Sequence, residues 1–96
     1  MSKWISKIRN QCHEVFAKVS IKNWKLEDGE LVYRNAENEI DYLLWVQVIG
    51  FNGGYLTNLV LSEGGSISHT IKSYPLNART EAGEIESLVN TLTKLV

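Results

Sequence analysis

The spacing of apolar residues changes twice along this chain, and that change constrains the fold more than any other feature. Near the N-terminus, apolar residues recur every three or four positions, which is the spacing of a helix with one buried stripe. The spacing then becomes two, which is typical of strands, and it returns to three and four near the C-terminus. The sequence therefore predicts a helix, a set of strands and a second helix.

Each predicted helix has an apolar stripe on one side only. The first is expected over residues 3–19, with the stripe Trp4, Ile5, Ile8, Cys12, Val15, Phe16 and Val19. The second is expected over residues 80–96, with Thr80 as a candidate N-terminal cap and the stripe Ile85, Leu88, Val89, Leu92, Leu95 and Val96. A helix with a single stripe buries it against one layer, so both helices are expected on one face of the sheet.

Short turns separate the predicted strands. The expected strands are 24–26, 31–33, 40–49, 55–62 and 67–74. The turns between them are 27–30, 35–39, 50–54 and 63–66. Asp28-Gly29 is a strong hairpin signal, because both central residues of a tight hairpin turn prefer positive φ. Pro75 is expected to end the last strand. Strands joined in this way pair as an antiparallel meander.

The 96 residues, without a break in composition, predict a single α+β domain over residues 1–96. Its two layers are a four- or five-stranded antiparallel sheet and a pair of helices on one face. The strand 40–49 is apolar on both sides, so one set of its side chains lies on the face without helices. We expect an interface there, homodimeric or with another protein. The alternatives are that the twisted sheet curls over this face, or that the hairpin near Trp24 folds back to cover it.

The sequence lacks the residue patterns that catalysis or metal binding requires. Cys12 lies on the predicted core stripe and His13 beside it on the outer side. His69 alternates with Ile67 and Ile71, which predicts a core histidine. A single cysteine and two histidines without zinc-ligand spacing exclude a zinc site, and the glycine-rich segments lack a phosphate-loop pattern. We therefore expect no enzyme, no cofactor and no metal.

Charge is distributed unevenly, although the net charge is only -1. Residues 1–25 hold six Lys and Arg against a single acid, whereas residues 27–41 hold six acids and one Arg. Such a local negative surface steers association with a basic partner and sets its specificity. The candidate binding residues are the acids Glu27, Asp28, Glu30, Glu37 and Glu39, with Trp45 and Tyr55 as aromatic anchors.

These features predict a small non-enzymatic module that binds a protein partner, as a stoichiometric inhibitor that blocks a site on it. In size, mild acidity and predicted outline, the chain resembles small α+β inhibitors of phages and bacteria, such as anti-defence and toxin immunity proteins. The alternative is a nucleic-acid or anionic-surface binder that uses the basic first helix, through Lys3, Lys7, Arg9, Lys18 and Lys22. The first 19 residues lack the apolar run of a signal peptide, so a cytoplasmic location is expected.

Overall fold

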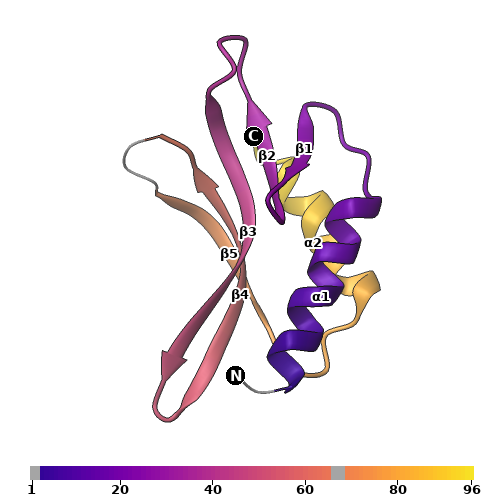
Figure 1. Cartoon of the computed structure of the whole chain (residues 1–96), viewed down its shortest axis with the longest axis vertical. Helices are drawn as coiled ribbons and strands as arrows, with labels where there is room; N and C mark the ends of the chain where they lie inside the picture. The colour runs from indigo at the N-terminus through magenta and orange to yellow at the C-terminus, as the bar shows by residue number, and fades with distance from the viewer. Residues whose placement is uncertain (1–2, 66–68) are drawn as a thin grey trace.

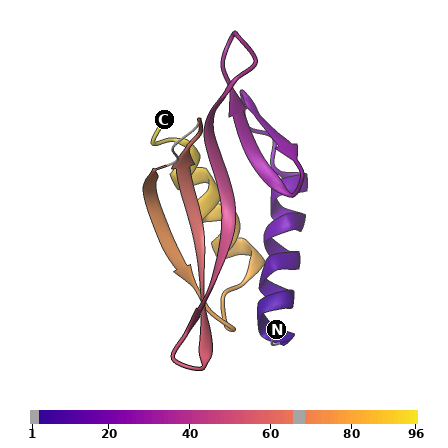
Figure 2. The same ribbon diagram turned by 60° about the vertical axis from the view of Figure 1, so that its left-hand side comes forward.

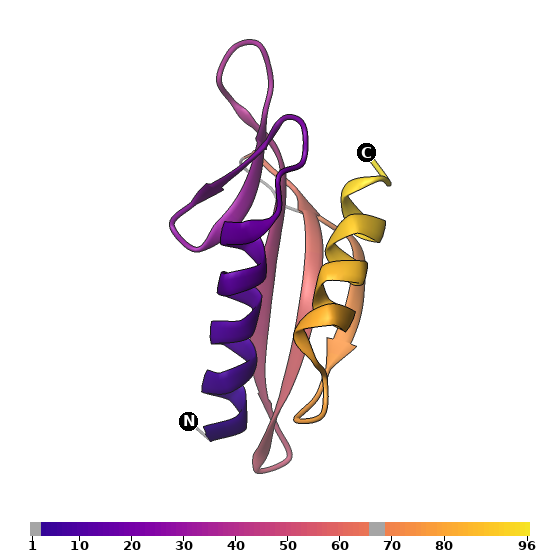
Figure 3. The same ribbon diagram turned by 90° about the vertical axis from the view of Figure 1, so that its right-hand side faces the viewer.

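Helices α1 (Lys3–Lys18) and α2 (Ala82–Thr93) lie side by side on one face of an antiparallel sheet and contact each other (Figure 3). The computed structural model describes residues 3–65 and 69–96, and within these ranges the sheet has five strands in sequential order. They are β1 (Trp24–Glu27), β2 (Glu30–Arg34), β3 (Ile40–Phe51), β4 (Gly54–Glu63) and β5 (Thr70–Leu76). The predicted α+β meander, with both helices on one sheet face, is confirmed (Figure 1).

The core lies between the helices and the sheet. Most of both helical stripes is buried there, through Ile5, Ile8, Cys12, Val15 and Phe16 of α1 and Ile85, Val89 and Leu92 of α2. Leu95 and Val96, which were predicted as part of the second stripe, follow the end of α2 and are exposed. From the sheet, Leu31, Leu44 and Leu61 stand directly opposite one another on β2, β3 and β4, and all three are buried in the same cluster. This register settles which side of β3 faces the helices. It is the side of Tyr42, Leu44 and Val46.

Two tight turns set the lengths of the strands. Asp28 and Gly29 join β1 to β2 with φ of 49° and 80°, as the Asp-Gly signal predicts. Asn52 and Gly53 join β3 to β4 with φ of 48° and 75°. The sequence predicted a longer turn over 50–54, but only these two residues are outside the ladder. Both strands are therefore longer than predicted and reach Phe51 and Gly54.

Pro75 was predicted to end the last strand, but it does not. It pairs with Asn58 inside β5, which continues to Leu76. A proline has no backbone N–H to donate, and β5 lies at the edge of the sheet, where one side of a strand needs no ladder hydrogen bond. Residues 66–68, which include the start of the predicted strand 67–74, lie outside the described residues.

The prediction of His69 as a core residue is wrong, since its side chain is exposed. The register of β4 with β5 shifts between Leu61 and Ser62, and on β5 it is Lys72, Tyr74 and Leu76 that share the face of the helix-covered residues of β4. Beyond the shift, Thr70 stands opposite Ser62, which lies on the face away from the helices, so the simple alternation that grouped His69 with Ile71 does not hold across it. A one-residue shift of this kind reverses which side chains are buried.

The helix ends also differ from the prediction. Helix α2 begins after Glu81, which makes no side-chain capping bond, and it ends at Thr93 rather than at 96. The hydroxyl of Thr80 instead accepts a hydrogen bond from the backbone N–H of Asn77, at 2.9 Å, in the turn before the helix. Helix α1 ends at Lys18, one residue before the predicted end.

Candidate protein-binding surfaces

The sheet face without helices is partly sealed by the chain itself. Val32, Val60 and Ser62 lie on this face and are almost completely buried. The indole N–H of Trp45 donates a hydrogen bond to the hydroxyl of Ser62, at 3.0 Å, so the indole lies across the pair β3–β4. Trp24 packs in the core on the helix side, so the first hairpin continues the sheet and does not fold back. The predicted anchor Trp45 is thus half-buried and held in place.

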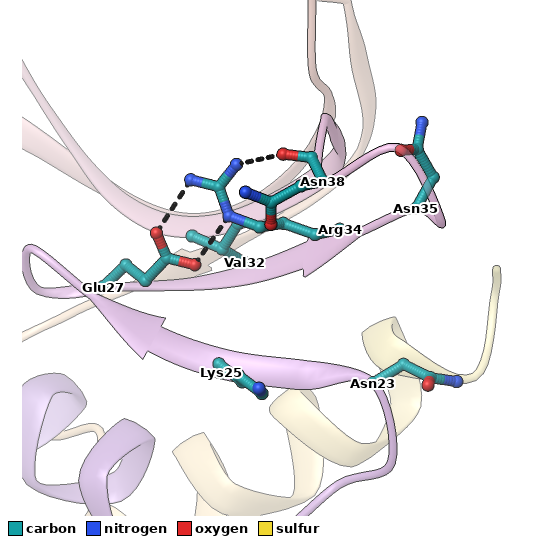
Figure 4. Close-up of a pocket in the computed structure, with 7 residues that line it drawn as sticks. All are labelled: Asn23, Lys25, Glu27, Val32, Arg34, Asn35 and Asn38. Atoms are coloured by element: carbon teal, nitrogen blue, oxygen red, sulfur yellow. Dashed lines mark hydrogen bonds and ion pairs between the residues drawn. The ribbon is translucent and has the colours of Figure 1, made fainter.

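An ion pair closes the part of this face over β1 and β2. The Nε and Nη2 atoms of Arg34 donate hydrogen bonds to the two carboxylate oxygens of Glu27, at 3.0 and 2.9 Å. Figure 4 shows the arginine side chain running over Val32 to reach Glu27. This hydrogen-bonded pair lowers the pKa of Glu27, and the same bonds raise the pKa of Arg34. Because the charge of Glu27 is neutralised within the chain, Glu27 is a poor candidate for steering a partner.

Beside this pair lies a shallow groove of about 260 Å³. Its lining is polar and comes from β1 and β2 and the ends of the adjoining turns: Asn23, Lys25, Glu27, Val32, Arg34, Asn35 and Asn38. The donors of Arg34 are directed at Glu27 and at the backbone oxygen of Asn38, at 2.6 Å, rather than into open space. The guanidinium of Arg34 is therefore already engaged within the chain.

The turn between β2 and β3, residues 35–39, forms an acidic tip at one end of the molecule (Figure 1). The side-chain oxygen of Asn35 accepts hydrogen bonds from the backbone N–H groups of Glu37 and Glu39, both at 3.0 Å. Its side-chain nitrogen donates to Asp41, also at 3.0 Å. Both glutamates are exposed. The tip thus presents two carboxylates on a backbone that its own hydrogen bonds hold in shape.

The two acidic turns predicted as one negative surface lie at opposite ends of β2. Asp28 and Glu30 are at its start, and Glu37 and Glu39 follow its end. Glu30 borders a second groove, of about 170 Å³, between α1, the β1–β2 turn and β3. Burial, and then the nearby charge of Asp28, raise the pKa of Glu30. The structure therefore separates the acids into two groups, and the exposed pair at the acidic tip lies at the opposite end of β2 from Asp28 and Glu30.

At the other end of the molecule, β3 and β4 extend beyond their neighbours. Among the described residues, β2 pairs with β3 only as far as Leu44, and β5 pairs with β4 only from Thr57 onward. We call residues 47–56 the arm; it projects past the N-terminal end of α1 (Figures 1 and 2). The sequence from Tyr42 to Ser62, which includes the arm, has no charged residue.

The arm exposes large apolar side chains. The exposed fractions are 42% for Ile49, 58% for Phe51, 45% for Tyr55 and 49% for Leu56. Ile49 and Leu56 are cross-strand partners on the face without helices, whereas Tyr55 pairs with Gly50 on the other face. Tyr55 was predicted as an anchor from the sequence, but Ile49, Phe51 and Leu56 were not, because residues 50–54 were assigned to a turn. The run of apolar residues on both sides of Asn-Gly was the available signal.

The basic residues of the alternative hypothesis follow α1. Lys3, Lys7 and Lys22 are exposed. Lys18 forms an ion pair with Glu86 of α2, at 3.2 Å, which directs its charge toward the neighbouring helix. Arg9 lines the second groove with Asp28 and Glu30. The basic residues are thus divided among α1, its junction with α2 and the chain that follows.

The cysteine and histidine side chains lie in different environments. The Cys12 side chain is buried in the core, and burial raises the pKa of its thiol to about 12. His13 and His69 are exposed. Within residues 3–65 and 69–96, no three His, Cys, Asp or Glu side chains are placed to hold a metal ion. In the same ranges, no helix has the length and apolarity needed to cross a membrane.

Comparisons with protein-family models, curated proteins and solved structures give no match to this chain.

Proposed function

We propose that this protein is a non-enzymatic protein-binding module, and the arm is the observation that carries the proposal. Ile49, Phe51, Tyr55 and Leu56 keep two-fifths to three-fifths of their surface in water. Exposed apolar patches of this kind mark interfaces, because their burial against another protein removes the surface from water.

The acidic tip supplies the second part of the proposal, which is inhibition by site blocking. Glu37 and Glu39 are exposed on a turn that Asn35 holds in shape, so the turn would lose little conformational entropy when a partner binds it. Two exposed carboxylates favour a partner with a basic site. We propose that the tip enters such a site and blocks it stoichiometrically.

A capture experiment tests this proposal. The full chain is immobilised and exposed to a native lysate of its source cells, alongside the double charge reversal Glu37→Lys/Glu39→Lys. The matched control is Glu81→Lys/Glu84→Lys on the exposed start of α2, which changes the net charge by the same amount. We expect one protein to be retained in equimolar amount by the wild type and by the control, and to be lost with the tip variant.

Retention of the same protein by the tip variant would overturn the inhibitor proposal. Binding of single-stranded nucleic acid that weakens steeply with salt, and that is unaffected by the tip variant, would favour the basic helix α1 as the functional surface.

A further inference from the structure

The backbone of the arm has an unpaired edge. Phe51 and Gly54 close the tight turn, so the carbonyl of Phe51 points toward β4. Backbone groups alternate in direction along a strand, so those of Ile49 also point toward β4, whereas those of Val48 and Gly50 point away. No described residue pairs with this side of β3 beyond Leu44. The N–H and C=O groups of Val48 and Gly50 therefore form a template for another strand.

The other edges of the sheet are protected against such pairing. At one edge, β1 has only four residues and includes Lys25 and Glu27. At the other edge, β5 includes Lys72, Pro75 and a register shift against β4. Charges, prolines and bulges at edge strands prevent association in many proteins. The β3 edge of the arm has none of these devices, so it is open to another strand.

The absence of charge decides what kind of strand fits. In a two-fold symmetric contact, each side chain near the axis meets its own copy, so a charged edge would repel itself. The arm is uncharged, although the chain has 21 Lys, Arg, Asp and Glu residues elsewhere. A basic or acidic peptide would find no complementary charge there. A second copy of the same edge meets apolar side chains of the same kind.

The exposed area of the arm agrees with a weak dimer. Phe51 leaves on the order of 100 Å² uncovered, since aromatic side chains bury 150–250 Å² when fully covered. Phe51 and Ile49 are the exposed apolar side chains of the pairing strand β3, whereas Tyr55 and Leu56 lie on β4, so the apolar contact is well below the area of about 800 Å² per partner in a standard interface. The paired backbone and the side chains of Gln47 and Val48 add to this area. A contact of this size is typical of weak, transient association.

We infer that a second copy of this chain pairs with the arm, β3 against β3, in an antiparallel ladder around a two-fold axis at Ile49. This inference rests on the proposed function, because it names the partner that the arm holds. In this register Val48 stands opposite the partner's Gly50, and Ile49 opposite the partner's Ile49. The two copies exchange hydrogen bonds through Val48 and Gly50. The acidic tips lie at the far ends of the dimer, where they remain available to another protein.

Sedimentation velocity on the purified full chain, from 1 to 200 μM, tests this inference. The wild type is expected to change from monomer to dimer across this range. Ile49→Lys places two like charges at the axis and is expected to raise the dissociation constant roughly 100-fold, and Ile49→Asp acts in the same way. An equimolar mixture of the two variants is expected to form a mixed dimer, because Lys then stands opposite Asp. Ile71→Lys, at an equally exposed apolar position on β5, is the control and is expected to dimerise like the wild type.

A monomeric wild type at 200 μM would overturn the inference, as would dimerisation that Ile49→Lys leaves unchanged or that Ile71→Lys abolishes. Failure of the Lys and Asp variants to associate when mixed would also overturn pairing about Ile49. Circular dichroism of each variant verifies that the monomer is folded. A failure here leaves the capture experiment on the acidic tip unaffected, since that experiment changes residues at the other end of the molecule.

Discussion

Substitution of Asn35 by alanine should loosen the acidic tip and destabilise the whole domain. The side chain of Asn35 makes three hydrogen bonds, to the N–H groups of Glu37 and Glu39 and to the carboxylate of Asp41. A hydrogen bond contributes about 1 kcal/mol net in a folded protein, and less where water can replace it. Two of these three bonds are exposed. We therefore expect a loss of about 1.5 kcal/mol in the free energy of unfolding.

Urea denaturation measures this loss. With a typical dependence of stability on urea for a small domain, a loss of this size lowers the unfolding midpoint by roughly 1 M. The backbone amides of Glu37 and Glu39 should also exchange hydrogen about tenfold faster, because the turn opens more often. The control is Asn10→Ala, at an exposed position of α1, which should be neutral or slightly stabilising since alanine favours helix.

Replacement of Asn35 by aspartate separates the two roles of the side chain. The aspartate retains an acceptor for both N–H groups, but it places a second carboxylate where the amide now donates to Asp41, at 3.0 Å. The destabilisation should be present at low ionic strength and should diminish in high salt, which screens the repulsion between the two carboxylates. If Asn35→Ala unfolds at the wild-type midpoint and its tip amides exchange no faster, the tip is not held by Asn35 and the argument for its rigidity fails.

Three further predictions concern the core and its titrating groups. Leu44→Ala, at a completely buried position between the sheet and the helices, should lower the free energy of unfolding by about 2–5 kcal/mol in urea titration. Leu26→Ala, at a side chain that is 46% exposed, should lower it by less than about 1 kcal/mol. Equal losses would contradict the assignment of the buried face of the sheet. Burial raises the pKa of the Cys12 thiol from 9.0 to about 12, so the contribution of the protonated thiol to stability is complete below pH 9 and is lost as the pH rises toward 12. Cys12→Ala should therefore lack this part of the alkaline destabilisation. Iodoacetamide should modify the wild-type thiol only at the rate of unfolding. The pKa of Glu30 is raised, first by burial and then by Asp28, so the contribution of the protonated carboxyl to stability is complete below its ordinary value of 4.5 and is lost as the pH rises through the folded value. Glu30→Gln should therefore unfold at the same temperature as the wild type at pH 3 and at a higher temperature at pH 7. A variant that is less stable than the wild type at pH 7 would refute this.

The sequence by itself determined the elements and their order. The helical stripes, the period of two and Asp28-Gly29 depend on residues near each other in the chain, and local patterns of this kind predict local structure. The same reasoning placed Cys12 in the core and His13 at the surface, as the structure has them. It failed for His69 and Pro75, because both depend on the register and edge position of β5.

The tertiary structure decided how the surfaces are formed. β3 is apolar on both sides, so its sequence is compatible with either face against the helices, and only pairing with β2 and β4 selects one. Pairing also determines that β3 and β4 extend beyond the ends of β2 and β5, and this extension leaves Ile49, Phe51 and Leu56 exposed on the arm. Likewise, Glu27 and Arg34 are seven residues apart, and only the twisted hairpin brings their charges together. Each of these features depends on contacts between distant parts of the chain, which periodicity along the sequence does not encode.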